Sequence, residues 1–141
     1  MNDDKSNADN PATVTAFFSG WTGGPGALQE LIAKYFTPET VWETIGSETT
    51  YGIDQAIDLC NRLENDAPPF KFVLEWSAIA ADGDMVLSER IDHYYNLDGS
   101  KRTMIKCMAI CQVRDGKIVM WRDYFNHSDW AAVLQAPEVA A

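Results

Sequence analysis

The sequence predicts an α+β fold in which N-terminal helices are followed by a curved antiparallel sheet. Apolar residues recur at helical spacing over 14–35 and again over 53–63. The second half instead carries the pairs Asp82-Gly83, Asp98-Gly99 and Asp115-Gly116 between long candidate strands. Because Asp-Gly suits the tight turns of hairpins, this half predicts a four-stranded meander. With helices on one face, the strongly curved sheet is expected to form a cone with a pocket at its open end.

Three helices and a short strand are expected in the first half. Asn10-Pro11 predicts the start of the first helix, because a capping residue precedes a proline at the first helical position. This helix ends at 22–24, and Pro25 begins the second. The other expected elements are a strand at 39–44, a loop at 45–50 and a helix from Gly52 to about Asp66, which Ala67-Pro68-Pro69 ends.

The second half is expected to hold four strands and a closing helix. The strands cover about 70–81, 84–97, 101–114 and 117–126, and the helix covers 127–135. The predicted domain organisation is a disordered tail at 1–10, a single domain at 11–136 and a short tail at 137–141.

Composition narrows the function. The chain has 141 residues, 46% of them hydrophobic, and a formal net charge of -10, which together predict one acidic domain with a sizeable core. Its charge argues against binding nucleic acid or an anionic membrane, and favours a neutral or cationic small ligand. The N-terminus lacks the basic-then-apolar order of a signal peptide. Cys60, Cys107 and Cys111 lack zinc or redox spacing, so we expect reduced thiols in a cytoplasmic protein.

One carboxylate falls on the apolar face of the last predicted strand. Asp123 alternates with Trp121 and Phe125, so the three side chains share a face. A buried carboxylate is costly unless it is paired, protonated or used in a reaction. The strand at 84–97 offers partners in Arg90 and Asp92, which also share a face. Two acids and one arginine in an aromatic cavity predict an acid/base site.

This site depends on the register of the last strands. If all three turns are two-residue loops, Arg90 faces Cys107, and Cys107 faces Tyr124. Asp123 would then lie one residue off the shared face. A bulge between the last two strands would restore the alignment, and such bulges are common beside active sites. Without the bulge, the three charged residues do not meet.

Two strings, ERID at 89–92 and WRDYF at 121–125, resemble limonene-1,2-epoxide hydrolases, and the order of elements resembles the NTF2-like, SnoaL-like cone fold. The similarity runs from the first helix to the closing one. It implies that Asp123 is the general base toward water, that Asp92 is the general acid toward the epoxide oxygen, and that Arg90 holds both carboxylates. It also implies one-step opening of a small apolar epoxide to a vicinal diol, without a metal or cofactor.

Two positions depart from that family. A tyrosine and an asparagine on its short strand help to hold the attacking water, whereas this sequence has Trp42 and Thr44. An indole donates one hydrogen bond but accepts none, and threonine is shorter than asparagine. Trp42 is equally suited to form a cavity wall. We assign Trp42 and Thr44, together with Trp121 and Phe125, to the pocket for substrate and water.

These departures leave alternatives open. The same acid/base pair could let an internal hydroxyl open the epoxide, or could isomerise or cyclise a carbon acid, as in SnoaL-like and ketosteroid-isomerase-like proteins. A third alternative is a non-catalytic module that binds an apolar ligand, with the charged residues forming only a buried ion network.

Other polar residues are expected outside the pocket. Alternation directs Glu43, Glu89 and His93 to the opposite faces of their strands, and His127 is expected to be a capping or surface residue.

Apolar residues on the outer face of the sheet predict a homodimer that covers this face. Leu87, Ile91 and Tyr95 share the outer face of one predicted strand. The expected partners are therefore a small apolar molecule and a second copy of the chain, with no nucleic acid and no membrane.

Overall fold

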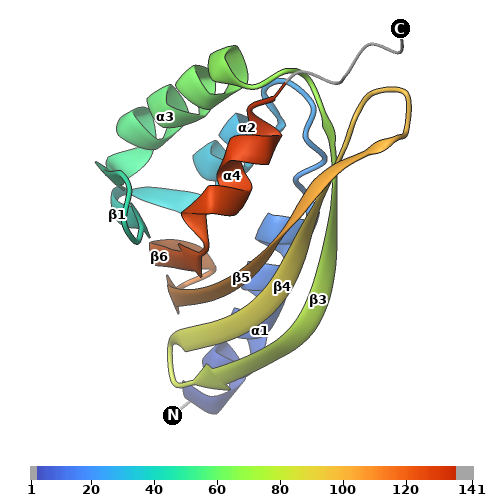
Figure 1. The fold of residues 1–141 in the computed structure, drawn as a ribbon. Coiled ribbons are helices and arrows are strands. Elements are labelled where there is room, and N and C mark those ends of the chain that lie inside the picture. The colour runs from blue at the N-terminus through green and yellow to red at the C-terminus, as the bar shows by residue number, and fades with distance from the viewer. Residues whose placement is uncertain (1–2, 136–141) are drawn as a thin grey trace, which may run out of the picture.

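The computed structural model describes residues 3–135 and confirms the α+β class (Figure 1). The helices are α1 (Asp3–Ser19), α2 (Ala27–Tyr35), α3 (Gly52–Asp66) and α4 (His127–Val133). The strands are β1 (Phe36–Thr44), β2 (Thr49–Tyr51), β3 (Lys71–Asp82), β4 (Met85–Tyr95), β5 (Lys101–Arg114) and β6 (Lys117–Phe125). The predicted tail at 137–141 lies outside the described residues. No described helix is long and apolar enough to span a membrane.

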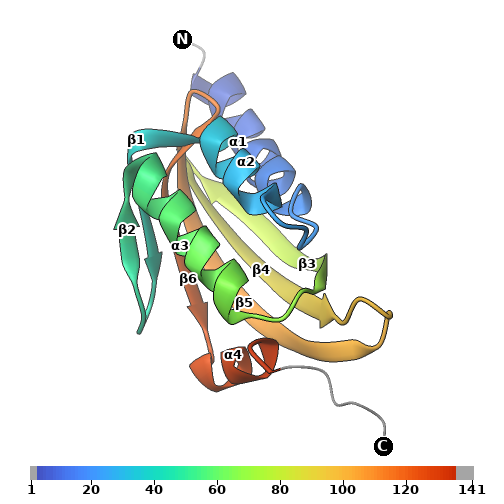
Figure 2. The ribbon, with the colours of Figure 1, turned by 90° about the horizontal axis from the view of Figure 1, so that it is seen from above.

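All six described strands form one sheet in the order β2-β1-β6-β5-β4-β3. The meander β3 to β6 is antiparallel throughout, as the Asp-Gly turns predict. Its long strands curve, and Figure 2 shows α1, α2 and α3 on one side of the sheet, with α4 across one end. β1 pairs with β6 in parallel and with β2 antiparallel. The loop predicted at 45–50 is therefore shorter, because its last residues belong to β2.

The first helix begins earlier than its sequence signal indicates. α1 starts at Asp3, so the predicted start at Asn10-Pro11 is wrong, and residues 3–10 are helical where a disordered tail is predicted. Asn10 does not cap the helix: its side chain is buried, and its amide donates to the backbone oxygen of Gly83 at 3.5 Å.

A bulge between β5 and β6 aligns the inward face of the sheet. Val113 pairs with Ile118 but Gln112 pairs with Met120, which leaves Val119 as the extra residue of β6. Beyond this point Cys107 pairs with Phe125 instead of Tyr124. The bulge that would bring Asp123 to the face of Arg90 is thus present.

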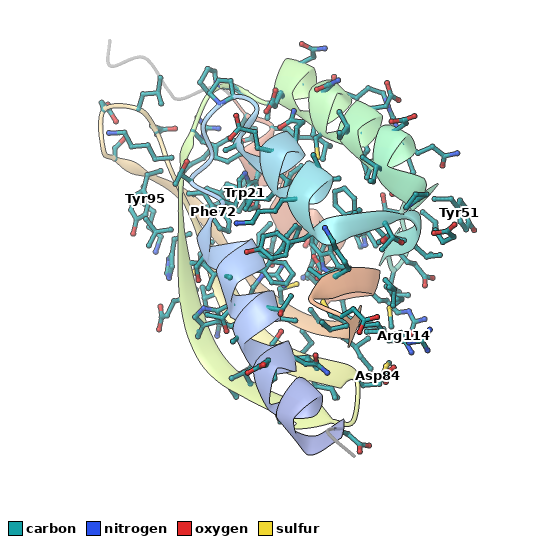
Figure 3. All side chains as sticks on the ribbon, turned by 180° about the vertical axis from the view of Figure 1, so that it is seen from behind. Trp21, Tyr51, Phe72, Asp84, Tyr95 and Arg114 are labelled. Atoms are coloured by element: carbon teal, nitrogen blue, oxygen red, sulfur yellow. The ribbon has the colours of Figure 1, made fainter. Side chains whose placement is uncertain are left out.

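Aromatic side chains fill the space between the helices and the concave face of the sheet. Phe17 of α1 is fully buried, and its ring lies 5.5 Å from that of Trp121, edge to face. Trp21 and Phe72 lie next to each other in the interior in Figure 3, with ring centroids 3.9 Å apart. Asp84 and Arg114, far from them in the same view, form an exposed ion pair of 3.2 Å. Packing of this kind fixes the inward strand faces relative to α1.

Candidate active site

A single guanidinium joins two carboxylates inside the fold. Arg90 donates from Nε to Asp92 Oδ1 at 2.8 Å and from Nη2 to Asp92 Oδ2 at 3.3 Å. It also donates from Nη1 to Asp123 Oδ1 at 3.2 Å and from Nη2 to Asp123 Oδ2 at 2.9 Å. The three side chains are at most 9% exposed. We call Arg90, Asp92 and Asp123 the buried triad.

Small side chains on β5 let Arg90 reach Asp123. β5 lies between β4 and β6, and the residues there that face Arg90 and Asp123 are Cys107 and Ala109. A larger side chain at either position would occupy the path of the guanidinium. From the helix side, the ring of Phe18 lies 4.4 Å below the guanidinium carbon, a cation–π contact that replaces part of the lost hydration.

Two stacked tryptophans flank the base candidate. The indole N–H of Trp121 donates to Asp123 Oδ1 at 2.6 Å. Trp42 of β1 stacks on Trp121, with ring centroids 4.4 Å apart and an interplanar angle of 4°. The Trp42 indole nitrogen is buried and has no hydrogen-bond partner among the described residues. Trp121 therefore fixes the carboxylate of Asp123, and Trp42 fixes Trp121.

Parallel pairing places Thr44 beside Asp123. In the β1–β6 register Trp42 pairs with Trp121, and Thr44 pairs with Asp123. The backbone N–H of Ile45 donates to the carbonyl oxygen of Asp123 at 3.0 Å, which ties the end of β1 to the same position. Thr44 is consequently the hydroxyl residue next to Asp123 along this part of the sheet.

The net charge of the buried triad favours protonation of one of its two acids. With both acids ionised the cluster carries one uncompensated negative charge, and protonation of either acid makes it neutral. Burial raises the pKa of Asp92; Arg90 opposes this effect, and the charge of Asp123 adds to it. Burial by itself would lower the pKa of Arg90, but Asp123 and Asp92 hold that pKa well above its usual value. Asp92 is thus suited to hold the proton.

A cavity of about 500 Å³ opens onto the buried triad. All seven side chains that the sequence assigns to the site line it: Arg90, Asp92, Asp123, Trp42, Thr44, Trp121 and Phe125. Most of the remaining inner wall is apolar, with α1, α3 and α4 contributing to it. Within residues 3–135, no three His, Cys, Asp or Glu side chains gather as they would around a metal ion. The site offers positioned acids and a cation in a largely apolar enclosure.

Three of the polar residues expected outside the pocket, Glu43, Glu89 and His93, do not line the cavity. His93 contacts Glu75 at 2.9 Å on the outer face, and Glu43 pairs with Arg122 at 2.9 Å. His127 is exposed as predicted, but it lies at the cavity, where its ring nitrogen contacts the backbone oxygen of Ile45.

The N-cap of α4 is Asn126, the residue before His127. The side chain of Asn126 accepts from the Ser128 N–H at 3.1 Å, so Asn126 caps α4, and a capping role for His127 is wrong.

Several cavity residues are absent from the sequence-based assignment. They include Phe18, Trp21, Phe70, Tyr94 and Trp130. Tyr94 shares the alternation of Arg90 and Asp92, so the period of β4 could have identified it. The aromatic residues of the helices and of the 67–70 connection carry no such signal, because their approach to the site is set by tertiary packing.

A family model described as the limonene-1,2-epoxide hydrolase catalytic domain matches residues 13–135. The chain belongs to this family. Epoxide hydrolase EphG of Mycobacterium tuberculosis (strain ATCC 25618 / H37Rv) is 31% identical over 91 residues, which are 64% of this chain and 58% of that protein. The alignment therefore spans less than two thirds of the relative's length.

Solved structures confirm the fold. An LEH-like epoxide hydrolase of M. tuberculosis superimposes with a TM-score of 0.70 and 25% identity, over 91% of this chain and 86% of that one. A protein described as a SnoaL-like polyketide cyclase, from Jannaschia sp. CCS1, gives a TM-score of 0.69 and 19% identity, over 94% and 96%. The cone architecture predicted from the order of elements is therefore that of the NTF2-like, SnoaL-like proteins.

The raised pKa of Asp92 predicts how stability changes with pH in Asp92→Asn. The neutral carboxyl contributes stability that is complete below the ordinary aspartate pKa of about 3.9 and is lost as pH rises through the raised pKa. Asparagine cannot ionise. The free energy of unfolding of the variant, relative to wild type, should therefore rise with pH across this window, by about 1.4 kcal/mol per unit of pKa difference.

Urea unfolding at a series of pH values measures this difference. Asp115→Asn is a matched control, because Asp115 is an exposed turn residue with φ 51, a conformation that asparagine tolerates. A relative stability of Asp92→Asn that falls with rising pH would show that Arg90 outweighs burial, contrary to the raised pKa.

Proposed function

We propose that this protein is a cofactor-independent epoxide hydrolase that opens a small, mostly apolar epoxide to a vicinal diol. The observation that carries the proposal is the buried triad, in which one arginine holds two carboxylates at the wall of an apolar cavity. Membership of the limonene-1,2-epoxide hydrolase family supports the reaction class. The raised pKa of Asp92 supports its role as the acid.

The reaction needs two proton transfers, one from water to the protein and one from the protein to the ring oxygen. Asp123 accepts a proton from water while the water oxygen forms a bond to an epoxide carbon. The bond from that carbon to the ring oxygen breaks, and the ring oxygen takes the proton of Asp92. Water and epoxide give the diol, and the proton now on Asp123 must return to Asp92. The triad carries one proton before and after the step, so its net charge is unchanged, and each positioned transfer is worth roughly 10²–10⁴-fold in rate.

The contacts of Arg90 suit it to stabilise a negative charge on either acid. Its Nη2 contacts both acids, at 3.3 Å from Asp92 and 2.9 Å from Asp123. As negative charge moves from Asp123 to Asp92 during the reaction, the same guanidinium remains in contact with it. A fixed, buried cation stabilises such a charge shift without reorganisation.

The attacking water would lie between Asp123 and Thr44. Thr44 pairs with Asp123 across the strands, and its hydroxyl can both donate and accept a hydrogen bond. Trp42 stacks on Trp121, and its indole N–H can only donate. We therefore assign the holding of water to Asp123 and Thr44, and assign Trp42 to the wall.

The altered water site also favours a second candidate, intramolecular epoxide opening. A hydroxyl of the substrate would give its proton to Asp123 and attack the ring, and Asp92 would protonate the ring oxygen, to form a cyclic ether with a hydroxyl group. The specific observation in its favour is Trp42, at a position where a water-holding tyrosine is expected from the family resemblance. The acid/base residues are the same in both reactions.

Turnover in ¹⁸O-labelled water of cyclic and terpene epoxides, including epoxides that bear a free hydroxyl group, distinguishes hydrolysis from intramolecular opening. Wild type should give a diol with one labelled oxygen, and Asp123→Asn and Asp92→Asn should each lower kcat/KM by about 10²–10⁴-fold. Asp115→Asn is the control and should keep wild-type turnover, because it changes an exposed turn. An unlabelled cyclic ether would point to the second candidate, and a bound epoxide left unchanged by folded wild type would contradict both.

We also propose that two copies associate through the outer face of the sheet. The exposed apolar side chains there are Val73, Leu87, Met104, Met108 and Tyr124, between 38% and 53% exposed. An apolar surface spread over four neighbouring strands is typical of a protein interface.

Sedimentation at equilibrium tests this association. Wild type is expected as a dimer and Met108→Glu as a monomer, because the new charge would be buried at the centre of the interface. Leu97→Glu adds the same charge on an exposed residue of the β4–β5 turn and should leave the dimer intact. A monomeric wild type at micromolar concentration would refute the proposal.

A further inference from the structure

Tyr94 is a cavity residue that the reaction described above does not use. It lies on the inward face of β4, two residues beyond Asp92, as Asp92 lies two beyond Arg90. Its side chain is 2% exposed and lines the same cavity as the buried triad. Along an extended strand, positions i and i+2 are roughly 6–7 Å apart. Tyr94 is therefore within the length of one small molecule from the acid.

Aromatic neighbours hold the Tyr94 ring in place. Its ring makes edge-to-face contacts with Phe70 at 5.0 Å, Phe72 at 5.3 Å and Trp130 at 6.2 Å between centroids. These contacts come from two distant parts of the chain, residues 70–72 and α4, so the ring direction is well determined. A phenylalanine would make the same ring contacts. The packing therefore does not account for the hydroxyl.

No hydrogen bond of the Tyr94 hydroxyl is found within residues 3–135, and Tyr94 lines the cavity. Buried tyrosine hydroxyls usually find a partner, since an unpaired one is destabilising. Burial and the charge of Asp92 raise the pKa of Tyr94 well above its usual value, so the hydroxyl keeps its proton and remains a donor. A polar group with these properties in an apolar cavity is a means of orienting a ligand.

We propose that Tyr94 is a specificity-determining residue whose hydroxyl donates a hydrogen bond to a second oxygen of the substrate. The preferred substrate class is then an epoxide that also bears a neutral oxygen function, such as a hydroxyl or carbonyl group, on the far side of a small ring. With the epoxide oxygen at Asp92 and the second oxygen at Tyr94, the molecule would lie along β4. This inference rests on the proposed hydrolase function and adds the substrate class to it.

Two epoxides of the same ring test the proposal. The probes are cyclohexene oxide and its analogue with a hydroxyl group on the ring carbon farthest from the epoxide. Wild type should prefer the hydroxylated epoxide in kcat/KM by about tenfold or more, because a site built to donate this bond disfavours a ligand that lacks it. Tyr94→Phe should bring the ratio of the two kcat/KM values close to one, mainly through KM for the hydroxylated substrate.

Tyr95→Phe is the matched control. Tyr95 is the next residue, and Figure 3 shows it directed outward, away from Trp21 and Phe72 in the interior. The Tyr95→Phe variant also loses one tyrosine hydroxyl, and it should keep the wild-type ratio of the two kcat/KM values. An unchanged ratio in Tyr94→Phe would overturn the proposal. An equal loss on both epoxides would also overturn it, because it would place Tyr94 at the epoxide or in the packing.

A binding assay separates this inference from the proposed reaction. If folded wild type opens neither epoxide, the hydrolase proposal fails while Tyr94 can still be tested. Calorimetric titration with cyclohexanol and with methylcyclohexane then measures the same preference without turnover. Wild type should bind the alcohol more tightly relative to the hydrocarbon than Tyr94→Phe does, and equal relative affinities in the two proteins would reject a role for Tyr94 in selecting ligands.

Discussion

The buried guanidinium of Arg90 has to be neutralised inside the protein, and the two carboxylates of Asp92 and Asp123 perform this task. An isolated charge in such an enclosure is very costly, so Arg90 depends on the two carboxylates for its compensation. They belong to two strands that do not touch, β4 and β6, with β5 between them. The requirement that they meet therefore constrains the sheet over three strands.

Several local features follow from this requirement. The bulge at Val119 turns Asp123 to the face of Arg90, and the small Cys107 and Ala109 keep the path between them open. Phe18 covers the guanidinium, and Trp121 donates to the Asp123 carboxylate that Arg90 also contacts. Each feature is ordinary by itself. Together they bury the two acids beside one shared cation, with at most 9% of each side chain exposed. Burial and a shared cation are the conditions under which one carboxyl keeps its proton.

Much of the second half of the fold could be predicted from local sequence. Asp-Gly turns limit the number of strand alignments, and the alternation within β4 and β6 identifies the inward Arg90, Asp92 and Asp123. The bulge could be required but not located, because one extra residue leaves no clear trace in a polarity pattern. The pairing of β1 with β6 is parallel and non-local, and the three residues of β2 are too few to show a period.

The interior of the site was harder to predict than its charged residues. The hydrogen bond from Trp121 to Asp123 depends on a rotamer, and the stack of Trp42 on Trp121 depends on the register of a parallel pair. α1 starts at Asp3, earlier than the local signal at Asn10 indicates. The Asn10 side chain bonds to the distant Gly83 instead of capping the helix, and local capping rules do not include such a contact. Where the sequence failed, contacts between distant segments decided the outcome.

The proposed chemistry depends on a single proton in the buried triad, held by Asp92, and carboxyl ¹³C NMR of aspartate-labelled protein tests this most directly. One carboxyl resonance should titrate above the ordinary aspartate range, be absent in Asp92→Asn and move to lower pH in Asp123→Asn, where a neighbouring negative charge is removed. If both acids titrate at or below the ordinary range, or if the high resonance belongs to Asp123, the assignment of acid and base is contradicted.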